Sequence, residues 1–242
     1  MQMLIDLHAH TSAISRCCKI PAPEVIRQAK EIGQDGIVLT NHYPKNYVQN
    51  GNTLAFAQKY IDEYAYARQC GDAEGFKVFF GIEISTELYP NVHMLVYGVE
   101  PSFCLKYPDM YNYPLEKLSR IVHEAGGTLV QAHPFRNGTH VLDTQYLDGI
   151  EINCHPYYNI SHADKLTKIA DETGLILTVG GDYHADTYHA VCGTYLPDTI
   201  TDGIALGAYL HNTDQIKLRI HEPNTETYYE TNYTRRNIPN KG

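Results

Sequence analysis

The sequence predicts a single α/β domain built around a parallel sheet or barrel. Short apolar runs alternate along the chain with amphipathic stretches, which is the pattern of repeated strand–helix units. The chain has 242 residues, which is enough to bury a full core, and no linker-like segment divides it. A hydrophobic content of 43% and a charged content of 19% are ordinary for a globular protein.

The apolar runs predict strands at residues 3–8, 36–40, 77–85, 92–97, 128–132, 149–153, 175–179 and 216–220. Helical spacing predicts helices at residues 23–32, 54–70, 115–125, 161–173 and 201–210. Gly33 and Gly71 are expected to end the first two helices, and Ser161 is expected to cap the fourth. Residues 201–242 thus give a C-terminal helix, a short strand and a polar tail, which we expect to be irregular from residue 222.

Net charge and cysteine usage limit the partners. The formal net charge is -9, so the chain has no excess of Lys and Arg for binding nucleic acid or an anionic membrane. The six cysteines show neither CxxC spacing nor a disulfide pattern, which favours reduced thiols and a cytoplasmic location. The N-terminal sequence MQMLIDLHAH resembles neither a signal peptide nor a membrane span.

Histidine and carboxylate side chains recur where the predicted strands end. Residues two apart on a strand share a face, so His8 and His10 point the same way at the end of the first strand. Comparable residues lie at the ends or starts of the later strands: His42, Glu83, His93, His133, Asp182 and His184. In α/β barrels the carboxyl ends of the strands form the active-site face, so we expect these side chains to meet there.

Imidazole and carboxylate together indicate a metal centre. Neutral imidazole and carboxylate suit Zn²⁺, Mn²⁺ or Fe²⁺, and one carboxylate such as Glu83 can bridge two metals. Two neighbouring metals can activate a shared water and hold both the attacking and the leaving oxygen of an ester. Metal charge would also attract an anionic phosphate despite the acidic chain.

These motifs together resemble the polymerase-and-histidinol-phosphatase (PHP) family of metal-dependent phosphoesterases. The resemblance covers about residues 1–200 and comprises DLHAHT, LTNH, GIEIS, HMLVYG, AHPFR, DGIEI and GGDYHA in that order. It implies a distorted (β/α)₇ barrel, two or three divalent metal ions (Zn, Mn or Fe), and hydrolysis of phosphate esters by a metal-bound hydroxide. The substrate class expected is a small phosphorylated molecule, most simply a phosphomonoester.

The resemblance also implies a set of ligands. His8, His10, Glu83 and Asp182 would surround one metal, and Glu83, His93 and His133 a second. His42 and His184 would contribute to a third metal, together with a residue shortly after the HxHT motif. There the family often has His or Asp, whereas this chain has Ser15, Arg16, Cys17 and Cys18. The third site is therefore incomplete, completed by Cys17 or water, or replaced by the fixed charge of Arg16.

Several neighbouring residues have two interpretations each. Arg136 either binds a substrate phosphate or forms a surface ion pair. Asp6 either holds a ligand histidine or fills a polar position in the barrel, and Glu151 and His155 either support the site or contact substrate. The acid that protonates the leaving oxygen is expected to be Asp182, His184 or water.

Two other functions compete with phosphoester hydrolysis. An amidohydrolase-type barrel also begins with HxH and ends with Asp, but it commonly bridges its metals with a Lys, where this chain has Glu83. The other alternative is a metal-binding module without turnover, which the unusual third site keeps open. The sequence does not indicate an oligomeric state.

Overall fold

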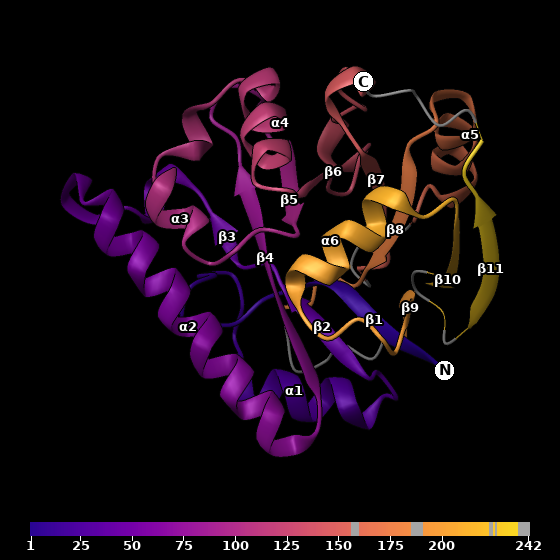
Figure 1. Ribbon diagram of the computed structural model, residues 1–242, viewed down its shortest axis with the longest axis horizontal. Coiled ribbons are helices and arrows are strands. Elements are labelled where there is room, and N and C mark those ends of the chain that lie inside the picture. The colour runs from indigo at the N-terminus through magenta and orange to yellow at the C-terminus, as the bar shows by residue number, and fades with distance from the viewer. Residues whose placement is uncertain (156–159, 185–190, 223–224, 226, 237–242) are drawn as a thin grey trace.

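The computed structural model describes residues 1–155, 160–184, 191–222, 225 and 227–236. Within these residues a single curved sheet forms the centre of the molecule (Figure 1). Its strands are β1 (Gln2–Ala9), β2 (Gly36–Leu39), β3 (His42–Tyr43), β4 (Lys77–Ser85), β5 (His93–Tyr97), β6 (Thr128–Gln131), β7 (Gly149–Asn153), β8 (Ile176–Gly180), β9 (Gly193–Pro197), β10 (Gln215–His221) and β11 (Tyr228–Thr234).

The strand order is β11-β10-β9-β1-β2-β4-β5-β6-β7-β8, with β3 beside β4. Strands β1, β2, β4, β6, β7 and β8 run in one direction, and β5 runs antiparallel between β4 and β6. The sheet curves until β8 approaches β1, which confirms the distorted barrel expected from the resemblance. The expectation of parallel strands is wrong for β5, because an apolar run does not reveal the direction in which its strand is inserted.

Helices pack on the outside of the barrel (Figure 1). The α-helices are α1 (Ala22–Glu31), α2 (Thr53–Glu74), α3 (Phe103–Lys106), α4 (Leu115–Glu124), α5 (Ala163–Thr173) and α6 (Gly203–Asn212). α1 buries Val25, Ile26 and Ala29, which lie on one face of the helix. α6 packs near the ends of β5 and β6 that lie away from the histidines, where Thr128 Oγ1 donates to the Gly207 carbonyl at 3.0 Å.

Some predicted boundaries are wrong for identifiable reasons. α2 passes through Gly71 and ends before Gly75, which has a φ of 64°. A Cβ on Gly71 would lie 2.6 Å from Val78, so this glycine allows close packing of α2 on β4 and does not stop the helix. Ser161 precedes the actual N-cap, His162, although its hydroxyl accepts from Ala163 N–H at 3.3 Å.

The polar C-terminal tail is not irregular throughout. Residues Tyr228–Thr234 form β11, which pairs antiparallel with β10 and is largely exposed. Its polar side chains lack the alternation that predicts a strand, and its partner supplies the pairing. β9 (Gly193–Pro197) was likewise not predicted and pairs antiparallel with β1.

The barrel has a seam between β1 and β8. In the described residues these two strands share no ladder, only an isolated bridge between Ala9 and Tyr183 just beyond β8. Backbone hydrogen bonds join His10 N–H to the Tyr183 carbonyl at 3.2 Å and Tyr183 N–H to the His8 carbonyl at 3.3 Å. Side chains of the candidate site lie along this seam.

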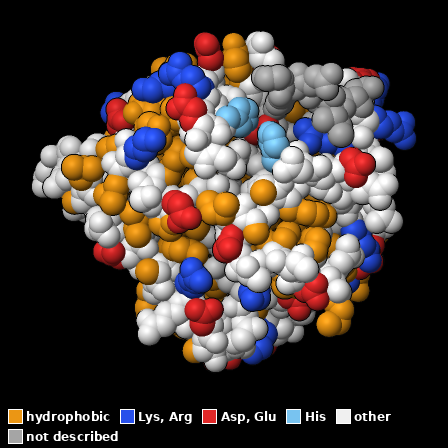
Figure 2. Space-filling view, viewed as in Figure 1, with side chains coloured by type: hydrophobic (Ala, Val, Ile, Leu, Met, Phe, Trp, Pro, Cys, Tyr) orange, Lys and Arg blue, Asp and Glu red, His pale blue; other side chains and the backbone are white. Residues whose placement is uncertain are grey.

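The molecular surface is mixed in character. Figure 2 shows acidic and basic side chains interspersed on the visible face, with exposed hydrophobic side chains between them. No helix among the described residues has both the length and the apolar character that a bilayer span requires.

Candidate metal centre

Four side chains from three separate parts of the chain meet at the carboxyl end of the barrel. His8 and His10 come from β1 and the residue after it, Glu83 from β4, and Asp182 from the segment after β8. One potential ligand atom from each lies within 4.8 Å of the others, and all four side chains are buried. The strand ends therefore bring together the first ligand set expected from the sequence.

The two carboxylate oxygens of Glu83 face different histidines. Oε2 lies 3.4 Å from Nε2 of both His8 and His10. Oε1 lies 2.7 Å from His93 Nδ1 and 3.1 Å from His133 Nε2. This arrangement allows Glu83 to bridge two cations, one through each oxygen.

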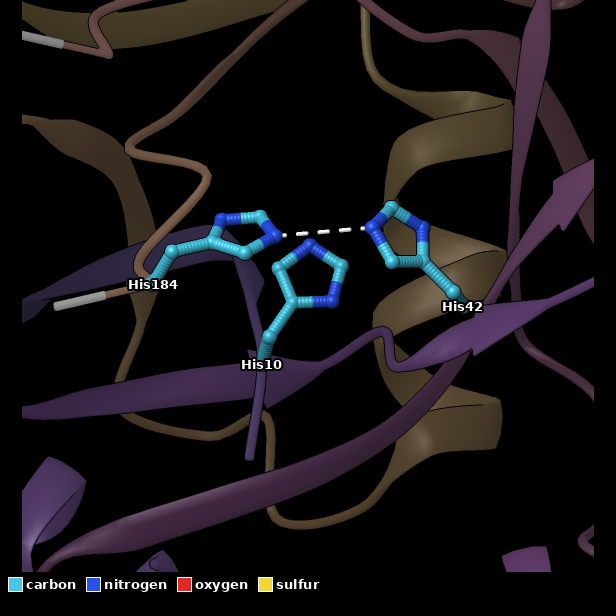
Figure 3. A group of neighbouring side chains, drawn as sticks. All are labelled: His10, His42 and His184. Atoms are coloured by element: carbon cyan, nitrogen blue, oxygen red, sulfur yellow. Dashed lines mark hydrogen bonds between the residues drawn. The ribbon is translucent and has the colours of Figure 1, made fainter. Parts of the chain in front are cut away.

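His42 and His184 extend the cluster on one side. His42 Nδ1 is 2.5 Å from Glu83 Oε2, and a potential ligand set includes His42, Glu83 and His93. His10, His42 and His184 form a further set (Figure 3), in which Nε2 of His42 and Nε2 of His184 are 3.4 Å apart. All eight residues expected from the sequence thus lie in one continuous cluster.

Hydrogen bonds fix which nitrogen of His8 and His10 faces the cluster. His8 Nδ1 lies 2.7 Å from Glu151 Oε1, an acceptor, so Nδ1 carries a proton and Nε2 is the nitrogen that a metal would bind. Ser15 Oγ donates to Asn41 Oδ1 at 2.8 Å, so it accepts from His10 Nδ1 at 3.0 Å. Both imidazoles therefore offer Nε2 as a ligand atom.

The residues present fit a bound cation. His8 Nε2 and Glu83 Oε2 are fully buried, lie 3.4 Å apart, and form no hydrogen bond of good geometry with the described residues, although His42 Nδ1 lies 2.5 Å from Glu83 Oε2. Leaving such atoms unsatisfied costs about 1–3 kcal/mol each. A divalent cation between them would satisfy both atoms at once, and their separation is in the range of two ligands on a single ion.

The electrostatics of the cluster also favour cations. Burial opposes ionisation of Glu83, but the charges of His42 and His8 outweigh it and hold the pKa of Glu83 well below its usual range. For Asp182, burial is likewise outweighed by His8 and Arg136, and its pKa is well below the usual range. Burial lowers the pKa of His133 to about 4, so this imidazole is neutral and can ligate.

The backbone holds two of these residues in uncommon conformations. His133 has a φ of 31° and Asp182 a φ of 55°, both in the left-handed region that non-glycine residues rarely adopt. Two residues before Asp182, Gly180 has no room for a side chain, since a Cβ there would lie 2.4 Å from His8 Cβ and from Glu151 Oε1. Such strain and close approach are typical of functional sites.

A cavity of about 470 Å³ opens onto the cluster. Arg136 lies in its wall with Nη1 2.5 Å from Asp182 Oδ2, and a second nitrogen donates to Asn153 Oδ1. Among the described residues, Arg136 therefore forms an ion pair with a carboxylate of the site, Asp182. Lys19 also lines this cavity and gives its mouth a second positive charge, which the sequence did not single out.

Asp6, Glu151 and His155 surround the cluster in different ways. Asp6 Oδ1 accepts from the backbone N–H groups of His8 and Gly181, at 2.9 and 2.8 Å, and contacts neither imidazole. Burial raises the pKa of Asp6 to about 7. Glu151 supports the site through His8, and His155 lies in the cavity wall. Ser15 was not recognised as the partner of His10, because the contact depends on a loop of irregular conformation.

Cys17 lies beside the cluster as well. Burial opposes its ionisation, but hydrogen bonding to His184 and His42 is stronger and lowers the pKa of the thiol to about 6. Arg16 turns away, with its guanidinium 4.5 Å from the centroid of the Tyr47 ring.

Comparison with known proteins agrees with this geometry. The family model described as the PHP domain matches residues 6–203. No curated protein matches the sequence.

Similar solved structures share the fold at low sequence identity. A two-domain protein from Bacteroides vulgatus, containing a predicted PHP-like metal-dependent phosphoesterase, has a TM-score of 0.66 and 14% identity over 91% of this chain. This chain spans 65% of that protein, less than two thirds of its length. PsfC from Pseudomonas syringae has a TM-score of 0.62 and 21% identity, covering 85% of this chain and 87% of PsfC.

An amidohydrolase from Chromobacterium violaceum, solved with bound sulfate and no metal, has a TM-score of 0.57 and 18% identity. The match covers 82% of this chain and 93% of the amidohydrolase. At such identities the likeness establishes the fold alone.

Proposed function

The chain belongs to the PHP domain family, and on that premise we propose that it hydrolyses phosphate esters of small molecules with the help of bound divalent metal ions. One observation carries the proposal. Six imidazoles and two buried carboxylates converge at one end of the barrel, beside a cavity whose wall also holds Lys19 and Arg136. Such a site combines cation ligands with positive charge for an anionic substrate.

The ligand sets follow from the contacts around Glu83. We assign His8, His10, Glu83 and Asp182 to one metal. The other oxygen of Glu83, with His93 and His133, is assigned to a second metal. His42 and His184 are left for a third. When bound, the metals would supply Lewis-acid charge and a nucleophile derived from water.

The protein side chains position the substrate. Arg136 holds its guanidinium at the edge of the cluster through Asp182 and Asn153, so a phosphate in the cavity would meet a fixed, oriented cation. Lys19, which is exposed, adds a second positive charge to the cavity wall. A cavity of about 470 Å³ matches a small molecule better than a macromolecule and favours a phosphomonoester as the substrate.

The proton for the leaving oxygen is assigned to water. Asp182 is ionised, since its pKa lies well below the usual range, and its two oxygens face His10 and Arg136. It therefore ligates and orients, and does not donate a proton. His184 is assigned to metal binding through its Nε2.

The likeness to the Chromobacterium amidohydrolase supports hydrolysis of a C–N bond as a second candidate. Glu83, and not a Lys, occupies the bridging position in this chain. Phosphate esters and cyclic amides tested side by side would distinguish the two reactions.

The deciding experiment combines metal content with turnover. We expect Glu83→Ala to lose bound metal and hydrolysis of an aryl phosphate together, since Glu83 contacts histidines of every ligand set. Glu172→Ala, an exposed carboxylate on α5, serves as the matched control. Full metal content and full phosphatase activity in Glu83→Ala would refute the proposal, as would metal binding without turnover of any phosphate ester by the wild type.

A further inference from the structure

A second cavity, outside the metal cluster, lies beside the loop that carries Arg16. This Arg16 cavity has a volume of about 560 Å³ and is lined by that loop, by the segment at Tyr47 and by the start of α2. Ile14 and Phe56 are buried and give it an apolar wall, and Arg16 and Lys59 are its charged residues. None of the described residues that line it is acidic, although the chain has a net charge of -9. The cavity therefore suits an anionic group joined to an apolar body.

The Arg16 guanidinium is held in place by stacking, and its donors stay available. It lies 4.5 Å from the centroid of the Tyr47 ring, and the Arg16 backbone N–H donates to the Tyr47 hydroxyl at 3.1 Å. Within the described parts of the chain the guanidinium forms no ion pair and donates no hydrogen bond. Because the N–H groups of a stacked guanidinium point outward in its plane, they can bind a carboxylate or a phosphate.

Lys59 adds a second positive charge from α2. It is exposed and lines the same cavity as Arg16. Glu63, one turn further along α2, lies close enough to feel the charge of Lys59, and burial raises the pKa of its carboxyl. Glu63 is not part of the cavity wall, so the charged side chains that do line the Arg16 cavity have one sign.

The Arg16 cavity adjoins the cavity over the metal cluster through a third one. This intervening cavity has a volume of about 330 Å³ and shares Tyr47 with the Arg16 cavity. It shares Cys17, His42 and His93 with the cavity over the metal cluster. A molecule whose phosphate lies at the metal cluster can therefore extend past Tyr47 toward Arg16.

The intervening cavity has a different character from its two neighbours. Glu87 lines it and is 3.5 Å from the Nζ of Lys45, which neutralises part of its charge. Its other polar side chains are neutral and include Asn46, Ser85 and Asn91. An anionic group gains nothing midway, whereas a neutral spacer can lie there and accept or donate hydrogen bonds. The charges that attract anions are thus at the two ends of the run.

We propose that the Arg16 cavity binds a second anionic group of the substrate, carried on the leaving alcohol at the far end of a neutral spacer. The inference rests on the proposed function and narrows its substrate class. The reacting phosphate lies at the metal cluster, and a carboxylate or phosphate at the other end binds Arg16 and Lys59. Arg16 is then a specificity-determining residue that contacts no reacting atom.

A series of linear alkyl phosphates tests the assignment on the full chain loaded with Zn²⁺ or Mn²⁺. The length of the alkyl chain is varied, and its far end carries a hydroxyl, a carboxylate or a second phosphate. Release of phosphate gives kcat/KM for each reacting end. The charge preference is the value for a charged end divided by the value for the hydroxyl end of the same length. In the wild type we expect a preference of about tenfold or more at the best length, as a charged hydrogen bond provides.

Variants of Arg16 identify the side chain responsible. Arg16→Gln should abolish most of the preference, and Arg16→Glu should reverse it, because a carboxylate there repels a charged end. Lys59→Gln should lower the preference less, since its ammonium lacks the planar array of donors. Arg120→Gln, at an exposed arginine on α4, is the matched control and should keep the wild-type preference. A general loss of activity cancels in this ratio, because all the esters react at the same cluster.

The outcomes separate this inference from the proposed function. A wild type that hydrolyses the hydroxyl-ended esters and prefers neither charged end at any length overturns the inference alone. An Arg16→Gln protein that keeps the wild-type preference, or an Arg120→Gln protein that loses it equally, does the same. A wild type that hydrolyses none of the esters overturns the proposed function and this inference with it. A preference for the carboxylate alone or the phosphate alone, lost in Arg16→Gln, supports the inference and identifies the second group.

Discussion

Replacing Glu151 by glutamine isolates the role of a carboxylate that we assign no metal contact. The Glu151 carboxylate accepts three hydrogen bonds: from His8 Nδ1 at 2.7 Å, from His133 N–H at 2.9 Å and from Asn153 Nδ2 at 3.1 Å. A glutamine has one acceptor oxygen and one NH₂ group. Whichever way the amide turns, its NH₂ group meets either His8 Nδ1–H or the fixed backbone N–H of His133.

The cost of this mismatch sets the expected magnitude. An unsatisfied buried donor costs about 1–3 kcal/mol. His8 can relieve it by moving its proton to Nε2, but Nε2 then loses the lone pair that faces Glu83 and Asp182. We therefore expect Glu151→Gln to weaken metal binding by about 10–100-fold, the range found when a partner of a ligand histidine is removed.

Competition with a chromophoric chelator measures this change. Metal-free wild type, Glu151→Gln and the exposed control Glu172→Gln are titrated with Zn²⁺, and thermal unfolding shows that each is folded. Unchanged zinc affinity in a folded Glu151→Gln protein would refute the argument that Glu151 sets the His8 tautomer.

Three further predictions follow from the same contacts. Gly180→Ala should lower the free energy of unfolding in urea by about 1–3 kcal/mol, because the added Cβ would overlap His8. Gly203→Ala, where the nearest atom lies 3.6 Å from the added Cβ, should keep nearly the wild-type free energy of unfolding. Equal stability of the two variants would contradict this. Arg136→Ala should raise KM for an aryl phosphate about tenfold or more, because a charged contact to the phosphate is lost. Arg120→Ala, a change at an exposed arginine, should leave KM unchanged. Steady-state kinetics measure both values, and an unaltered KM in Arg136→Ala would argue against phosphate binding by Arg136. Removing metal should lower Tm by about 5–10 °C. One site in the presence of free metal at about 100 times its Kd adds about 2.7 kcal/mol to the free energy of unfolding. Scanning calorimetry with and without chelator tests this, and an unchanged Tm would oppose the ligand assignments.

The barrel and the clustering of the eight expected residues were predictable because both depend on local pattern. Apolar runs mark the strands, and ligand-type residues recur at their ends, so the shared end of the barrel brings them together. The reversed direction of β5 was not predictable, although it leaves His93 at the correct end as the first residue of its strand.

The supporting contacts were harder to predict because they join distant segments. Glu151 and His8 are 143 residues apart, and nothing in either local sequence indicates that they meet. The partners of His10 depend on the loop that contains Ser15, whose turns follow no repeating pattern. The same loop directs Arg16 onto the Tyr47 ring and places Cys17 in the cavity wall, an arrangement that the residue types alone left open.

The seam between β1 and β8 gives the metal a mechanical role. His8 and His10 stand on one side of that seam and Asp182 on the other, 172 residues after His10. A cation held by all three would cross-link the first strand to the segment after the last parallel one, where backbone pairing is sparse. Loading the site would then complete the circumference of the barrel, and stripping it would let this one joint open before the rest of the fold.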